Sequence, residues 1–232
     1  MKACGGFFMS KPLLFDPLQV PVVRVDRHLP PVPKEQLTAQ ALKVRFANPP
    51  PWRPELVRER VFMDRAPAPA AVLVGLVMRD ELTVLLTQRT AHLSTHSGQI
   101  AFAGGKSDPE DRNATETALR EAHEEVGLGA KHVQVLGELP VYITGSSFHV
   151  TPVIALIAPH MTLSLNTFEV AQAFEVPLSF LMNPVNHRWH RVEHDGVSRE
   201  WLSMPYQDGE HLRFIWGATA GMLRNLYCFL QA

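Results

Sequence analysis

Three glutamates in one short stretch are the residues of this chain best suited to catalysis. Glu121, Glu124 and Glu125 stand at spacings of i, i+3 and i+4, which on a helix places their carboxylates within an arc of roughly 100°. Carboxylates this close repel one another, and a divalent cation between them turns the repulsion into ligation. Because oxygen ligands without a nearby cysteine suit a hard ion, the pattern predicts Mg²⁺ or Mn²⁺.

The segment around these glutamates has the ends expected of a helix. Asn113 is a suitable N-cap with Glu116 three residues later, and Gly127 suits the left-handed position after a helix. An adjoining apolar face can pack on a sheet and consists of Ala118, Leu119, Ala122 and Val126. Upstream, Gly104 and Gly105 allow the backbone to leave a strand and approach a ligand closely.

Taken together, these residues resemble the Nudix box. Six residues stand at positions of that motif: Gly105, Arg120, Glu121, Glu124, Glu125 and Gly127. One position differs, because Asp111 stands where the motif has a loop glutamate and one extra residue follows it. The sequence therefore leaves Asp108, Glu110 and Asp111 open as the acid that braces Arg120.

The residues before the box narrow the resemblance to the coenzyme A diphosphatases of the Nudix superfamily. They read Leu-Leu-Thr-Gln-Arg-Thr at 85–90 and His-Ser-Gly-Gln-Ile-Ala-Phe at 96–102. Segments 151–153, 174–178 and 215–219 are similar to the same subfamily. The resemblance implies an α/β (α+β) fold, an α/β/α sandwich with a mixed β-sheet between helices. It also implies hydrolysis of coenzyme A to 3′,5′-ADP and 4′-phosphopantetheine.

The resemblance also implies roles for individual residues. It makes Glu121, Glu124 and Glu125 metal ligands, with the Gly105 carbonyl as a further one, and Arg120 their orienting ion-pair partner. A glutamate before a strand like 174–178 completes such sites, and Glu169 fits this place as a ligand or as the general base.

The cations best placed for the phosphates of a substrate are Arg89 and Lys106. Arg89 also has an ordinary alternative, as a surface arginine at the end of a strand. His96 and Gly104 border the same substrate side, although His96 equally suits a role in stabilising its own loop.

The composition excludes several other classes of function. The chain has 232 residues and a net charge of −1, so it offers no basic field for nucleic acid. Cys4 and Cys228 lie at opposite ends of the chain, which fits a reducing cytoplasm. The longest apolar run, at 66–78, is too short to span a membrane. We expect a cytoplasmic protein with a small-molecule nucleotide substrate.

The proline-punctuated, weakly patterned run at 1–35 predicts an N-terminal extension, and the resemblance implies a Nudix hydrolase domain at 36–232. The proline-rich extension either wraps the domain or forms contacts between subunits, as in a homodimer. We expect helices at 37–46, 177–182 and 217–230; strands at 70–78, 82–88, 99–103, 132–139, 149–157 and 174–176; a loop at 142–147; and a hairpin of 187–194 with 199–205.

Two other groups of residues could suggest a metal site or a catalytic pair, but a structural role explains each of them better. A zinc site of His187, His190 and His194 is disfavoured, because in an alternating strand they do not all share one face; a solvated hairpin fits better. Ser97 beside His96 is not a catalytic pair by itself. We also expect His123 on the surface, away from the glutamates.

Three rival functions remain open. A diphosphatase of dinucleotides or (d)NTPs keeps the chemistry and changes the substrate, and the segment 89–102 disfavours it. A non-catalytic nucleotide-binding regulator predicts degraded glutamates, whereas all three are intact. A calcium-stabilised interaction domain predicts metal binding without turnover.

Overall fold

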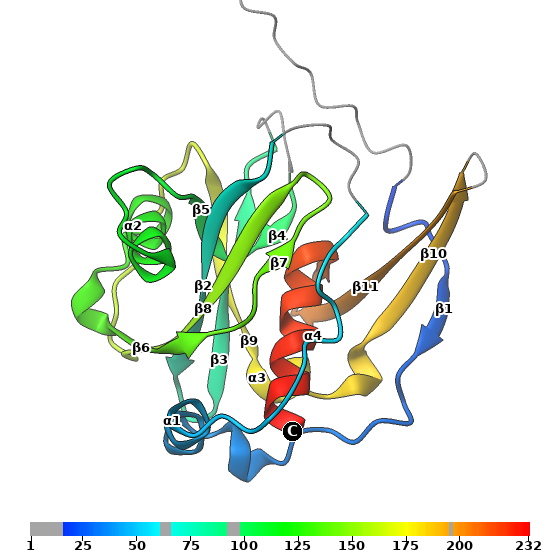
Figure 1. Cartoon of the computed structure of the whole chain (residues 1–232), viewed down its shortest axis with the longest axis horizontal. Helices are drawn as coiled ribbons and strands as arrows, with labels where there is room; N and C mark the ends of the chain where they lie inside the picture. The colour runs from blue at the N-terminus through cyan, green and yellow to red at the C-terminus, as the bar shows by residue number, and fades with distance from the viewer. Residues whose placement is uncertain (1–15, 61–65, 92–97, 195–196) are drawn as a thin grey trace, which may run out of the picture.

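The computed structural model describes residues 16–60, 66–91, 98–194 and 197–232, and a mixed eight-stranded β-sheet forms its centre (Figure 1). Its main path runs β4 (Ile100–Ala101), β3 (Leu82–Arg89), β2 (Ala68–Met78), β8 (Phe148–Ile157) and β6 (Val133–Glu138). Beside that path, β5 (Ala103–Lys106) pairs with β2, β7 (Tyr142–Ile143) with β8, and β9 (Val170–Pro177) with β3. The pair β2–β8 is parallel and the other pairs are antiparallel.

Both faces of this sheet are covered. Helix α2 (Ala114–Val126) packs on one face through Ala118, Ala122 and Val126. The opposite face carries α4 (Gly217–Gln231) and a larger apolar cluster. Because side chains on both faces of β2 are buried, its run is apolar throughout. The predicted α/β fold, with a mixed sheet between helices, is confirmed.

A second, four-stranded sheet adjoins α4. Its order is β1 (Val22–Val25), β10 (Arg188–His194), β11 (Val197–Asp208) and β12 (His211–Trp216). The remaining elements are α1 (Ala39–Ala47), α3 (Leu178–Leu181) and the short 3₁₀ helices η1 (Lys34–Leu37), η2 (Ala130–His132) and η3 (Pro184–Asn186). In the part of the chain described here, no helix is long and apolar enough to cross a membrane.

Several elements differ from those expected from the sequence. The run 99–103 is two strands, β4 and β5, and the paired glycines lie inside β5, not beyond a strand end. The segment 142–147 contains the short strand β7, and β9 is longer than 174–176. These differences share one cause, because strand pairing with β2, β3 and β8 supplies hydrogen bonds that local propensity does not reveal.

The N-terminal segment also takes part in the structure. β1 pairs with β10, and the Asp26 carboxylate after it is 1% exposed and accepts a hydrogen bond from Trp189 Nε1 at 2.7 Å. Residues 16–35 therefore lie against the second sheet. The division at residue 35 stays a prediction.

The solvated hairpin expected at 187–194 is wrong for two of its histidines. His187 is 0% and His190 3% exposed, and the ring nitrogens of His190 lie 2.9 Å from Val20 O and 2.8 Å from Ser203 Oγ. β1 and α4 pack against this sheet and bury the histidines. The sequence alone gives no sign of this, because polar and apolar residues alternate along the segment. The described residues hold no group of three metal-ligating side chains.

Candidate functional site

Helix α2 presents the three glutamates, and its two ends are fixed as expected. The Asn113 side chain accepts a hydrogen bond from the Glu116 N–H at 2.9 Å, which caps the N-terminus. Gly127 ends the helix with φ +68°, a left-handed conformation that favours glycine. The apolar face of α2 packs on the sheet. The glutamate face therefore lies along β5.

The two glycines of β5 allow close approach on different sides: Gly105 faces the helix and Gly104 faces β2. A Cβ on Gly104 would lie 2.4 Å from the Ala71 carbonyl oxygen, and one on Gly105 would lie 2.6 Å from the Glu121 carboxylate. Any side chain at either position would therefore displace its neighbour. The Gly104 N–H in turn donates to Glu125 Oε2 at 3.2 Å, which brings Glu121 and Glu125 to the same short strand.

Arg120 is braced by Asp111, which settles the choice among the three loop acids. Its Nε lies 3.1 Å from Asp111 Oδ1 and its Nη2 2.9 Å from Oδ2. The Asp111 carboxylate also accepts from Thr117 Oγ1 at 2.9 Å and from the Asp108 N–H at 3.0 Å. The Arg120 guanidinium, together with these donors, holds the pKa of Asp111 well below its usual range.

The same guanidinium reaches the glutamate face of the helix. Arg120 Nη1 donates to Glu121 Oε1 at 2.9 Å and to Glu124 Oε2 at 3.2 Å, while Nη2 donates to the Lys106 carbonyl at 3.0 Å. Arg120 thus joins the loop, the helix and strand β5. Its role in orienting the glutamates stays a prediction.

Glu125 is a buried carboxylate with little to balance its charge. It is 4% exposed, and burial raises its pKa to about 7, against the opposing effects of the Gly104 N–H and Arg89. Arg89 Nη1 lies 3.5 Å from Glu125 Oε1, and the buried Nε of Arg89 has no hydrogen-bond partner. Burial is also the main cause that raises the pKa of Glu121.

Glu169 stands in a turn just before β9 and near the other carboxylates. Its charge raises the pKa values of both Glu121 and Glu125. The turn is tied to the end of α2, because the Asn166 N–H donates to the Glu125 carbonyl at 2.9 Å. Immediately beyond it, the pairing of β9 with β3 shifts register between Gln88 and Arg89, an irregularity that can redirect neighbouring side chains.

The donor chemistry of this cluster fits a hard divalent cation. Its candidate ligands are all oxygens, the carboxylates of Glu121, Glu125 and Glu169 among them, and their mutual repulsion favours a positive charge. Glu124 is the most exposed of the helix glutamates, at 55%; it shares Arg120 Nη1 with Glu121, and its charge raises the pKa of Glu121. Among the described residues no three acidic, histidine or cysteine side chains are already arranged for ligation, so joint ligation by the glutamates requires their carboxylates to rotate.

The remaining expected residues are placed differently. The Lys106 side chain is exposed, and only its carbonyl takes part in the contacts around Arg120. His96 and Ser97 lie outside the described residues. His123 is exposed, as expected.

Sequence reasoning missed two residues of the site, Asn166 and Thr90. Both hold the turn of Glu169, since the Thr90 N–H donates to the Glu169 carbonyl at 3.0 Å and Asn166 Nδ2 lies 3.4 Å from Glu169 Oε1. The spacing Asn-x-x-Glu, typical of a side-chain-stabilised turn, was the available signal.

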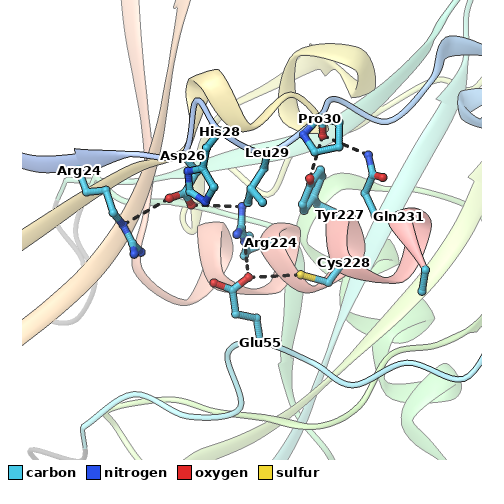
Figure 2. A pocket seen from close by; sticks show the side chains of 11 residues that line it. Arg24, Asp26, His28, Leu29, Pro30, Glu55, Arg224, Tyr227, Cys228 and Gln231 are labelled. Atoms are coloured by element: carbon cyan, nitrogen blue, oxygen red, sulfur yellow. Dashed lines mark hydrogen bonds and ion pairs between the residues drawn. The ribbon is translucent and has the colours of Figure 1, made fainter.

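A pocket of about 600 Å³ lies elsewhere, between the segment after β1 and the second half of α4 (Figure 2). Its charged side chains already pair with one another: Arg224 Nε lies 2.7 Å from Glu55 Oε2 and Arg24 Nε 3.3 Å from Asp26 Oδ1. Because those charges are balanced internally, we place the chemistry at the glutamate cluster and not at this pocket.

Comparison with known proteins identifies the family of this chain. The family model described as NUDIX domain matches residues 67–203. A protein described as an uncharacterized Nudix hydrolase, NudL, from Yersinia enterocolitica is 43% identical over 157 residues, which cover 68% of this chain and 78% of that protein. Its counterpart from Yersinia pestis strain Pestoides F is 40% identical over 157 residues, 68% of this chain and 77% of the relative.

Solved structures include more remote matches. A Caenorhabditis elegans Ap4A hydrolase is 21% identical with a TM-score of 0.40, covering 48% of this chain and 80% of its own. A MutT/nudix family protein from Enterococcus faecalis is 15% identical with a TM-score of 0.42, covering 72% of this chain and 63% of its own. Likeness of this degree does not identify a substrate. The family model and the NudL relatives do establish the family, and this chain is a Nudix hydrolase.

Proposed function

We propose that this Nudix hydrolase cleaves the diphosphate of coenzyme A and releases 3′,5′-ADP and 4′-phosphopantetheine. The observation that carries the proposal is the placement of Glu121 and Glu125 against the glycine pair of β5. There Glu121 shares Arg120 with Asp111 and Glu124, and the buried Glu125 has the Gly104 N–H and Arg89 beside it, so that the carboxylates outnumber the cations. Nudix hydrolases generally use divalent metal ions, and such a surplus of carboxylate oxygen favours them.

The proposed metal ligands are Glu121, Glu124 and Glu125, with the Gly105 carbonyl as a further one. Bound Mg²⁺ or Mn²⁺ supplies neutralisation of charge on the two phosphates and a lowered pKa for water. Arg120 keeps Glu121 oriented, because its other nitrogens are fixed by Asp111 and by the Lys106 carbonyl. Glu124 joins the ligands by leaving its exposed contact with Arg120.

The proposed proton acceptor is Glu169. It stands outside α2 on a turn held by Asn166 and Thr90, so it approaches the substrate from a different side than the helix carboxylates. A carboxylate in that position can accept the proton of the attacking water while the diphosphate is held by other groups. If Glu169 is the base, Glu169→Gln removes the acidic limb of the pH–rate profile, whereas an unchanged profile places the base elsewhere.

The proposed phosphate contacts come from Arg89, Lys106 and the backbone at Gly104. Arg89 is the best supported, since its Nε is buried without a hydrogen-bond partner and its Nη1 stands 3.5 Å from Glu125. A phosphate oxygen would satisfy that nitrogen. Lys106 is exposed at the end of β5 and can approach from solvent.

The choice of coenzyme A is supported by the resemblance of residues 85–90 and 96–102 to that subfamily. The test is a product assay with a panel of diphosphates: coenzyme A, acyl-coenzyme A, a dinucleoside polyphosphate, ADP-ribose and dATP, each under Mg²⁺ and then Mn²⁺. We expect 3′,5′-ADP and 4′-phosphopantetheine from coenzyme A at the highest kcat/KM. Faster turnover of the dinucleotide or dATP would contradict coenzyme A as the substrate. The absence of turnover with every compound would contradict the proposed hydrolase function.

A further inference from the structure

A buried arginine of the second sheet bridges two strands of the central sheet. Arg213 lies on β12 and is 8% exposed. Its Nη1 donates to Gln88 Oε1 at 3.1 Å and to Gln172 Oε1 at 2.8 Å. These two glutamines are directly opposite each other where β3 pairs with β9. One nitrogen of the guanidinium therefore holds the two strands at the same rung of the ladder.

The bridged rung stands directly beside a β-bulge. Gln88 is opposite Gln172. The next residue of β3, Arg89, is opposite Val170, so Ala171 is an extra residue on β9. A bulge disrupts the ladder locally and changes the direction of the neighbouring side chains. The side-chain bridge therefore adds a constraint at the point where backbone pairing is weakest.

The bulge separates side chains that point to opposite faces of the sheet. Successive side chains of a strand alternate between the faces. Gln172 shares its face with Phe174, over whose ring centroid the Cζ of Arg213 lies at 4.2 Å. Arg89 points to the face of α2, where its Nη1 lies 3.5 Å from Glu125 Oε1. Arg213 therefore acts on the site from behind the sheet, through the backbone of β3.

Arg213 is itself well anchored. Its Nε donates to Asp208 Oδ2 at 3.0 Å on the adjoining strand β11, and its guanidinium packs on the ring of Phe174. A planar guanidinium held in this way loses little further freedom when it binds two amides. An apolar side chain here would avoid the cost of burying a cation but could not donate to both glutamines.

From these contacts we propose that Arg213 is a positioning residue for the reaction: by bridging Gln88 and Gln172 it fixes the bulge that directs Arg89 towards the phosphates of the substrate. The inference rests on the proposed function for the phosphate contact of Arg89. The proposed base, Glu169, precedes the same bulge on β9. Because a misplacement of about 1 Å can cost on the order of 10²-fold in rate, a residue behind the sheet can affect the chemistry.

The test is binding of inorganic pyrophosphate in Mg²⁺, measured by calorimetry on the full chain. Arg213→Met removes both donations, so Arg89 is held less firmly. Pyrophosphate binding should weaken about 5- to 20-fold, a fraction of the value of a full charge-assisted hydrogen bond. Gln172→Ala removes one of the two contacts at an exposed position, where folding is little affected, and should weaken binding in the same direction.

The matched control is Arg79→Met. Arg79 also binds a side chain of β9, with its Nη2 at 2.6 Å from Glu175 Oε1, but it does so away from the bulge. This variant should bind pyrophosphate like the natural chain. Urea denaturation of the variants of Arg79 and Arg213 shows that each is folded under the conditions of the binding experiment.

A double-mutant cycle with Arg89 separates positioning from a general loss of structure. If Arg213 acts through Arg89, Arg213→Met should weaken pyrophosphate binding by less than about twofold in a chain that already carries Arg89→Met. Kinetics on coenzyme A gives a second readout. A displaced Arg89 raises KM, whereas a smaller folded fraction lowers the apparent kcat alone, so Arg213→Met should raise KM about as much as it weakens pyrophosphate binding.

Two results would overturn the proposal. One is unchanged pyrophosphate binding in both Arg213→Met and Gln172→Ala. The other is a loss from Arg213→Met that is equally large with and without Arg89→Met. A natural chain that releases no 3′,5′-ADP from coenzyme A, while the variants lose pyrophosphate binding as expected, would overturn the proposed function and leave this inference standing.

Discussion

Two arginines, on opposite faces of the central sheet, each organise a group of carboxylates in very different ways. Arg120 stands on α2, with a side chain 26% exposed, and contacts Asp111, Glu121 and Glu124. Arg224 stands on α4, with a side chain only 4% exposed, and contacts Asp26 and Glu55. The Arg224 cluster joins segments far apart in the sequence, whereas the Arg120 cluster lies within residues 106–124, and only the Arg120 cluster has more carboxylates than cations.

The Arg224 cluster is closed. Asp26 accepts hydrogen bonds from Trp189 and lies 3.3 Å from Arg224 Nη1, which also donates to His187 Nδ1 at 2.9 Å. Figure 2 shows Asp26, Arg224 and Glu55 in an unbroken chain of contacts. Two positive charges, on Arg24 and Arg224, meet two negative ones, as expected of a cluster that holds the N-terminal segment to α4.

The Arg120 cluster is open. The donors of the Arg120 guanidinium are divided among Asp111, Glu121, Glu124 and the Lys106 carbonyl, and no hydrogen bond from it to Glu125 or Glu169 is found among the described residues. The pKa of Glu125 rises to about 7 because its burial is poorly compensated. The difference teaches how to tell the two kinds of cluster apart: structural clusters pair their charges internally, and a functional one keeps a surplus for its ligand.

The largest effect expected from this comparison is a loss of stability when Arg224 is replaced. Replacing Arg224 with Met removes the buried cation beside Asp26, which keeps only Arg24 and Trp189 Nε1, and should lower the free energy of unfolding by about 3 kcal/mol, the lower end for breaking a buried ion pair. Urea denaturation measures this loss. Arg191→Met, which removes an exposed pair with Glu200, is the control and should change stability by less than about 1 kcal/mol. Equal losses in both variants would contradict a structural role for the Arg224 cluster.

The second prediction concerns Glu125. Glu125→Gln keeps the shape of the side chain but removes a buried charge, so turnover should fall by at least ~10²-fold. Stability should hold or rise, because no desolvated charge remains. Turnover of coenzyme A and thermal unfolding are measured on one preparation. Near-normal turnover would remove Glu125 from the site.

The third prediction concerns His187 in the Arg224 cluster and the dependence of the protein's stability on pH. Arg224 Nη1 can only donate, so His187 Nδ1 accepts and the ring is neutral. Burial lowers its pKa to about 4, from an ordinary value of 6.5. Above pH 6.5 this group costs no stability, and as the pH falls from 6.5 to 4 the unfolded chain takes up a proton that the folded chain refuses.

His187 should therefore remove on the order of 3 kcal/mol of stability across that pH window. Denaturant unfolding at several pH values measures the slope. In His187→Gln the slope should become shallower, whereas the exposed His123→Gln should keep that of the natural chain. A slope unaltered by His187→Gln would mean that the ring does not stay neutral in the folded protein.

The fourth prediction is the smallest and separates the stability of α2 from its chemistry. Asn113→Ala removes the cap that accepts the Glu116 N–H and should lower the free energy of unfolding by about 1 kcal/mol. Asn113→Asp, which retains an acceptor, is the control. Because Asn113 touches none of the carboxylates of the site, kcat for coenzyme A should stay within about twofold in both variants.

Sequence was most informative where the determinants are local. The spacing of Asn113, Glu116 and Gly127 predicted the ends of α2 closely, since capping and a left-handed glycine act within one helix. The order of Glu121, Glu124 and Glu125 predicted a shared face in the same way. The central strands followed from apolar runs that are buried on both faces.

Sequence was least informative where a partner lies far along the chain. His187 and His190 looked solvated because β1 and α4, which bury them, are distant in sequence. The choice of Asp111 over Asp108 and Glu110 depended on how the loop folds back onto Arg120.

The most direct test of the central claim is calorimetric titration of the intact chain with Mn²⁺. Glu124→Gln and Glu125→Gln should each weaken Mn²⁺ binding at least about tenfold, as expected when an ionised ligand is lost. Glu116→Gln, on the same helix but paired with Arg112, should bind like the natural chain. Full affinity in both Glu124→Gln and Glu125→Gln would contradict the assignment of the α2 carboxylates as metal ligands.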